Sequence, residues 1–212
     1  MDKENSKKII LDLCGGTGSW SLPYKEAGYD VRNITLPDYD VRTYKPPKNV
    51  YGILSAPPCD QFSFARTKAK KPRNLVGGMQ LVIACLRIIW ECQYQLKKDT
   101  QKYPPLKFWV LENPNGMLKW FLGKPAFEFN PYDFGDNYQK KTYLWGWFIE
   151  PKKKPIELPK RLKELHKTNS QPLPILKPYK SLNPKMFGKL TRQERRAITP
   201  KGFADAFFRA NQ

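Results

Sequence analysis

An apolar run that ends in a cluster of glycines constrains the fold of this chain more than any other feature. Residues 8–14 (Lys-Ile-Ile-Leu-Asp-Leu-Cys) predict a buried strand. Gly15, Gly16 and Gly18 predict a tight turn, and residues 19–21 open a helix. Such a turn lets a ligand approach the backbone. Its spacing matches neither the dinucleotide fingerprint nor the phosphate loop. It therefore indicates either a nucleotide-type site or a turn that only connects a strand to a helix.

Further apolar runs predict an α/β fold. The expected strands are 29–34, 50–54, 106–111 and a last pair, 126–130 and 142–148, that forms a hairpin. Residues 75–97 form the strongest helix, and Cys85 and Cys92 lie on its apolar face as structural residues. Residues 199–210 form a helix that packs back on the domain.

The charge of the chain indicates a polyanionic partner, with nucleic acid as the first candidate. The 212 residues carry a net charge of +19, from 38 basic and 19 acidic residues. Residues 151–201 alone hold 15 basic and 3 acidic residues. We therefore expect a catalytic core over 1–150, a small basic arm over 151–190 that tracks phosphates, and a C-terminal segment over 191–212.

Several classes of site are not expected. The four cysteines include no C-x-x-C pair, and His166 is the single histidine, so we predict no metal site, no disulfide scaffold and no Cys-His catalytic pair. No apolar run looks long enough to span a bilayer, and the N-terminus does not resemble a signal peptide. We expect a soluble, cytoplasmic monomer without membrane partners.

Two further strand ends carry reactive side chains. Pro57-Pro58-Cys59 follows the strand at 50–54, and Glu112-Asn113-Pro114 follows the strand at 106–111. The carboxyl ends of strands are where ligands bind in an open α/β sheet. Cys59 is thus a candidate nucleophile, although most cysteines are only small buried hydrophobes. Glu112, partly desolvated, could hold a proton, or could merely stand beside an Asn-Pro cap.

A basic loop follows Cys59. Residues 64–74 contain five basic residues and no acidic one. The loop could close over a phosphate backbone as a mobile element, or could be a solvated linker. Its basic residues are Arg66, Lys68, Lys70, Lys71 and Arg73.

The order of these motifs resembles the cytosine-C5 DNA methyltransferase family, especially its short phage and prophage forms. Residues 12–18 resemble the first family motif, and residues 58–63 the Pro-Cys-Gln nucleophile motif. Glu112-Asn113-Pro114 resembles Glu-Asn-Val, and residues 138–141 resemble Gln-x-Arg-x-Arg. Residues 195–200 resemble Arg-x-Leu-Thr-Pro.

The resemblance implies a Rossmann-like fold that binds S-adenosylmethionine and methylates C5 of cytosine in DNA. Cys59 would add to C6, and protonated Glu112 would bind N3 and the exocyclic amine. Asn113 would hold Glu112, and Lys141 would contact O2 or a phosphate. The base must be flipped out or already unpaired. The implied donor site comprises Asp12, Cys14, Gly15, Gly16, Gly18, Trp20, Asp40, Val41 and Pro57. The implied nucleic-acid contacts are Gln61, Ser63, Arg66, Lys68, Lys70, Lys71, Arg73, Gln139 and Lys140.

The chain departs from the family pattern in ways that leave alternatives open. Cys14 replaces the family's aromatic residue, so stacking on adenine falls to Trp20, and Asp40 lies on the adenine side unless it is an ordinary turn residue. The reduced arm supplies affinity without reading bases. The same chemistry would serve RNA or another one-carbon group. A decayed methyltransferase fold that only binds DNA is the remaining alternative.

Overall fold

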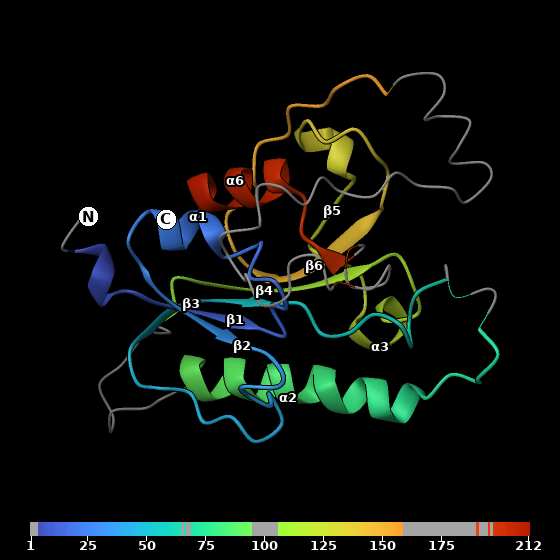
Figure 1. Cartoon of the computed structure of the whole chain (residues 1–212), viewed down its shortest axis with the longest axis horizontal. Coiled ribbons are helices and arrows are strands. Elements are labelled where there is room, and N and C mark those ends of the chain that lie inside the picture. Colours follow the sequence, from blue (N-terminus) through green and yellow to red (C-terminus); the bar gives the residue numbers. More distant parts are fainter. Residues whose placement is uncertain are drawn as a thin grey trace.

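A computed structural model describes residues 4–64, 66, 69–94, 106–158, 190, 195 and 197–212. Within these residues the chain is a mixed α/β fold, as predicted, built on one six-stranded sheet (Figure 1). The strands lie in the order β2-β1-β3-β4-β6-β5; β2, β1, β3 and β4 are parallel, and β6 runs antiparallel to both of its neighbours. The strands are β1 (Ile9–Leu13), β2 (Asp30–Ile34), β3 (Val50–Ser55), β4 (Phe108–Pro114), β5 (Phe127–Phe129) and β6 (Thr142–Trp147). This mostly parallel sheet is compatible with a Rossmann-like fold.

Helices cover both faces of the sheet. Helix α2 (Leu75–Gln93) lies on one face, and α1 (Leu22–Glu26) and α6 (Lys201–Ala210) lie on the other (Figure 1). Successive residues of a strand point to opposite faces, so β1 places Ile10 toward α6 and Leu11 toward α2. The short helices are η1 (Asn5–Lys7), α3 (Lys119–Leu122) and η2 (Pro131–Phe134).

The strand order creates a switch point beside β1. From β1 the chain passes to β2 on one side and then crosses to β3 on the other. At such a point the connections leave in opposite directions and open a crevice at the carboxyl ends of the strands, where ligands bind in open α/β sheets. The glycine turn after β1 and the Pro57-Pro58-Cys59 segment after β3 both lie at this edge.

Three boundaries differ from the sequence-based prediction. Helix α1 begins at Leu22 rather than Ser19, because the turn after β1 runs to Ser21. Helix α2 ends at Gln93, and the rest of its predicted span, from residue 95, lies outside the described residues. Strand β4 continues through Pro114 because β6 pairs with it up to that residue, so Glu112 lies within the strand rather than after it.

The predicted hairpin is confirmed, since β5 and β6 are antiparallel neighbours. Most of the predicted basic arm, 159–189, lies outside the described residues. Its first residues run beside η2: the amide of Lys154 donates to Asp133 O (2.8 Å), and the amide of Ile156 donates to Tyr132 O (3.0 Å).

Helix α2 corrects one expectation about membrane segments. By length and composition alone, Leu75–Gln93 could cross a membrane, which the sequence analysis did not anticipate. Core helices of soluble proteins meet the same criterion, and seven residues of α2 are buried. The fold is therefore consistent with a soluble protein.

Candidate active site at the carboxyl edge of the sheet

The glycine turn after β1 has backbone angles that explain its composition. Gly16 (φ 53°) and Gly18 (φ 71°) adopt left-handed conformations, which glycine tolerates best. The amide of Gly18 donates to Gly15 O (2.9 Å), which closes the turn. A Cβ on Gly16 would meet no atom within 4 Å, so the outer side of the turn is open to a ligand. Cys14 also has a positive φ, 57°, an uncommon angle for a residue with a side chain.

A buried carboxyl group, that of Asp12, packs against the glycine turn. Asp12 is fully buried, and Ser21 Oγ donates to its Oδ2 at 2.6 Å. Burial raises the Asp12 pKa from 3.8 to about 6, because desolvation disfavours the charged form. Its Oδ1 has no hydrogen-bond partner. A Cβ on Gly15 would overlap the Asp12 carboxyl, so only glycine fits there.

Asn33 is a site residue that the sequence analysis missed. It is the register partner of Asp12 on β2, and its Nδ2 donates to Gly16 O (3.0 Å). Its Oδ1 is buried without a hydrogen-bond partner. An unpaired acceptor costs free energy unless a ligand donates to it. The signal in the sequence was its place near the end of the second strand.

Two of the implied donor contacts are core residues. Trp20 is 2% exposed and packs against Phe203 and Phe207 (centroids 5.7 and 5.6 Å), so it cannot stack on an adenine, and that prediction is wrong. Val41 is 4% exposed and packs with α2, which leaves only its backbone for a ligand.

Asp40 lies at the edge with its carboxylate already engaged. Arg42 donates to it from its Nε and from its amide (2.9 Å), and the ion pair has an N–O distance of 2.5 Å. These bonds hold the Asp40 pKa down at about 2. An adenine amino group would have to share this carboxylate with Arg42.

The segment that carries Cys59 is fixed from two sides. Asn113, fully buried, donates from Nδ2 to Pro57 O (3.0 Å), so it holds the proline segment rather than Glu112. Cys59 O accepts from the amides of Phe62 (3.0 Å) and Ser63 (2.8 Å). The fully buried Phe62 anchors this turn in a cluster with Val82, Leu111, Leu118, Tyr143 and Trp145. Cys59 itself is half-buried.

One lysine acts on both candidate catalytic groups. Burial raises the pKa of the Cys59 thiol, and the charge of Lys140 lowers it. Burial also raises the pKa of Glu112, and Lys140 again opposes that shift. Glu112 in turn raises the Cys59 pKa, so the three side chains share one electrostatic environment. Lys141, the lysine selected from the sequence, is instead paired with Glu128 at 3.1 Å.

The described residues of the basic loop after Cys59 form hydrogen bonds with the segment that precedes them. Gln61 Oε1 accepts from Arg66 Nη1 (2.9 Å) and from the amide of Asn74 (2.7 Å). Arg73 donates to the carbonyls of Gln61 (2.8 Å) and Ser63 (2.9 Å). Both arginines thus donate hydrogen bonds to oxygen atoms within the protein. In an irregular loop, carbonyl groups that no strand or helix pairs can accept such bonds.

The other residues predicted to contact nucleic acid differ in how exposed their side chains are. Lys70 and Lys71 are exposed on the loop, Gln139 is half-buried, and Lys68 lies outside the described residues. Lys70 and Lys71 therefore remain the candidates for phosphate contacts in the described part of this loop.

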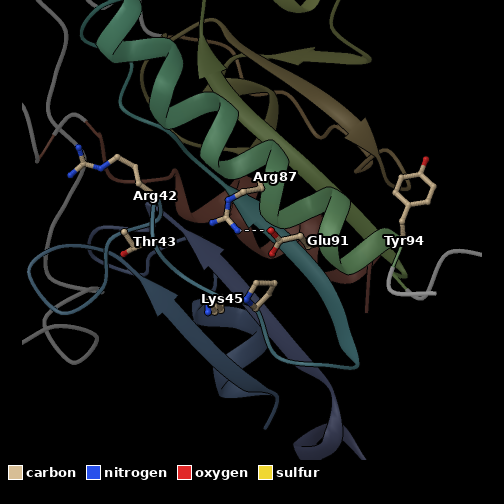
Figure 2. Close-up of a pocket in the computed structure, with 7 residues that line it drawn as sticks. Arg42, Thr43, Lys45, Arg87, Glu91 and Tyr94 are labelled. Carbon is tan, nitrogen blue, oxygen red and sulfur yellow. Dashed lines mark hydrogen bonds and ion pairs between the residues drawn. The ribbon is translucent and has the colours of Figure 1, made fainter. Parts of the chain in front are cut away.

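A surface hollow of about 710 Å³ lies apart from these groups. It lies between α2 and the connection that follows β2, and Arg42, Lys45, Arg87, Glu91 and Tyr94 are among its lining residues (Figure 2). Arg87 pairs with Glu91 at 2.6 Å and donates to Tyr44 O at 2.8 Å. The lining includes none of the candidate catalytic residues.

No protein-family model matches the chain, and neither does any curated protein. Among the described residues, no group of three or more His, Cys, Asp or Glu side chains could hold a metal ion.

Proposed function

We propose that the protein transfers a methyl group from S-adenosylmethionine to C5 of cytosine in DNA. The observation that carries the proposal is the shared environment of Cys59, Glu112 and Lys140, next to a glycine turn at the switch point of the sheet. A thiol, a carboxyl with a raised pKa and a cation are the groups that this reaction needs. As part of the proposal, the protein acts as a monomer in the cytoplasm of a bacterium or an infected cell.

In this mechanism Cys59 first adds to the base. Its thiolate forms a bond to C6 of cytosine, and the π electrons of the C5–C6 double bond move to C5 and delocalise through C4 toward N3, which makes C5 nucleophilic. Burial raises the pKa of Cys59, and the charge of Lys140 opposes this effect in part and so helps the thiolate to form. Glu112, protonated at a higher pH than an ordinary glutamate, donates to N3 and stabilises the charge that develops there. After the methyl group is in place, the C5 proton is lost to a base or water and the Cys59–C6 bond breaks.

The edge residues fit the methyl donor in part. The open side of Gly16 leaves room for a ligand, whereas the unpaired Oδ1 atoms of Asp12 and Asn33 are buried. When bound, S-adenosylmethionine supplies the electrophilic methyl group. Since Trp20 is buried, the adenine face falls to another side chain, and the exposed Leu36 (65%) on the loop after β2 is the candidate.

The test is mass spectrometry of nucleosides. Purified protein is incubated with S-adenosylmethionine and unmodified DNA or RNA, beside the Cys59→Ala variant. We expect 5-methylcytosine in DNA with the intact cysteine alone. Product only in RNA would change the substrate and keep the mechanism, and a different mass added to cytosine would change the donor. Binding without turnover would favour a decayed fold that only binds nucleic acid.

A further inference from the structure

Three aromatic side chains are exposed directly beside the Cys59 segment. Phe64 is 42% exposed, and Trp120 and Phe121 on α3 are 62% and 50% exposed. The rings of Phe64 and Trp120 lie with centroids 5.7 Å apart. We call Phe64, Trp120, Phe121 and the neighbouring Lys119 the aromatic platform. Exposed aromatic groups of this kind mark interaction surfaces.

The aromatic platform is held on a fixed base. Ser63 and Gly116 form an isolated antiparallel bridge, and the amide of Met117 donates to Phe62 O (2.9 Å). These bonds join the segment after Cys59 to the segment before α3. Phe62, between Cys59 and Phe64, is fully buried and anchors this segment in the core. A surface that is already formed loses little entropy when it binds.

The charge around the aromatic platform suits a polyanion. The described residues of 61–74 and 115–126 include six basic residues, Arg66, Lys70, Lys71, Arg73, Lys119 and Lys124, and no acidic one. Lys119 Nζ lies 6.0 Å from the Phe64 ring centre and 5.9 Å from that of Tyr143, so a cation stands among the rings. Rings interleaved with cations are the arrangement on which unpaired bases stack while their phosphates are held.

We propose that the aromatic platform binds unpaired nucleobases next to the target cytosine. The base faces of a duplex are covered by stacking, so only single-stranded or locally opened nucleic acid can use these rings. The proposal rests on the proposed function, in which Cys59 is the nucleophile. Phe64 directly follows Ser63, whose amide donates to Cys59 O at 2.8 Å, so the aromatic platform begins next to the Cys59 turn. The proposal specifies what that function leaves open, namely that the substrate is engaged with its bases unpaired.

Fluorescence anisotropy with oligonucleotides that contain no cytosine tests this proposal. A labelled single-stranded deoxyadenosine 20-mer and a duplex of the same length are titrated with the wild-type protein and with Trp120→Ala. The matched control is Trp90→Ala, because Trp90 is 52% exposed on α2. We expect Trp120→Ala to weaken single-strand binding about tenfold. Trp120→Ala should change the affinity for the duplex and the salt dependence of binding by less than about twofold. Trp90→Ala should change the affinity for the single strand by less than about twofold. Trp120→Phe should restore most of the loss.

Equal effects of Trp120→Ala and Trp90→Ala, or equal losses on single strand and duplex, would overturn the proposal. So would a variant that changes only self-association. Phe64→Ala provides a second test if Trp120→Ala fails to fold. Because the probes lack cytosine, the result does not depend on methyl transfer. A selective loss without detectable methylation would overturn the proposed function alone, and methylation without a selective loss would overturn the platform alone.

Discussion

Replacing Asp12 by asparagine should raise the free energy of unfolding above that of the wild type at neutral pH. In acid, the two free energies of unfolding should be equal. Asp12 is fully buried, and its pKa rises from 3.8 to about 6 on folding. The folded state therefore favours the uncharged carboxyl. That contribution to stability is complete below pH 3.8 and is lost as the pH rises through about 6. The difference between the two pKa values corresponds to about 3 kcal/mol.

Urea unfolding of wild type and Asp12→Asn from pH 4 to pH 8 measures this effect. The asparagine keeps an oxygen that can accept from Ser21 Oγ, as Asp12 does at 2.6 Å. The free energy of unfolding of the variant should match that of wild type near pH 4. It should exceed the wild-type value by up to about 3 kcal/mol above pH 7. Asp38→Asn, which removes an exposed carboxylate, controls for the change in net charge. An equal destabilisation at pH 4 and pH 8 would refute the reasoning.

Three further substitutions test the groups around Cys59. Lys140→Met should move the alkylation of Cys59 by iodoacetamide to higher pH, because the charge of Lys140 lowers the Cys59 pKa. Lys141→Met should not, because Lys141 is paired with Glu128; peptide mass spectrometry follows the reaction. Glu112→Gln should cut turnover far more than DNA affinity, and wild-type turnover should fall as the pH rises through the raised pKa of Glu112; equal losses of turnover and affinity would make Glu112 a binding residue. Phe62→Ala should lower the free energy of unfolding by about 3–5 kcal/mol in a urea titration, since the ring is fully buried; a change below about 1 kcal/mol would remove its assigned role as an anchor.

The local signals in the sequence were sufficient for the fold class. Apolar runs that end in glycine or proline located five of the six strands closely, and the hairpin of β5 and β6 followed from two adjacent runs. The hydrophobic periodicity could not show that β6 pairs with β4, because a local pattern does not specify which distant strand becomes the neighbour. That pairing extended β4 past Glu112.

The sequence could place the reactive groups but not their partners. Cys59 and Glu112 follow from strand ends, whereas the choice between Lys140 and Lys141 depends on which way each side chain points before β6. Trp20 was misassigned because Phe203 and Phe207 of α6, more than 180 residues later in the sequence, cover it in the structure. Arg66 and Arg73 looked like phosphate contacts, because composition alone does not show that the loop uses their donors.

Covalent trapping tests the central claim, attack of Cys59 on C6 of cytosine, most directly. An oligonucleotide that carries 5-fluorocytosine is incubated with the protein and S-adenosylmethionine. Fluorine at C5 cannot leave as a proton does, so the Cys59–C6 bond should persist after methyl transfer. We predict a protein–oligonucleotide adduct that forms only with the methyl donor, maps to the peptide containing Cys59 and is absent from Cys59→Ala. An adduct on another cysteine, or an oligonucleotide methylated equally by Cys59→Ala, would contradict the claim.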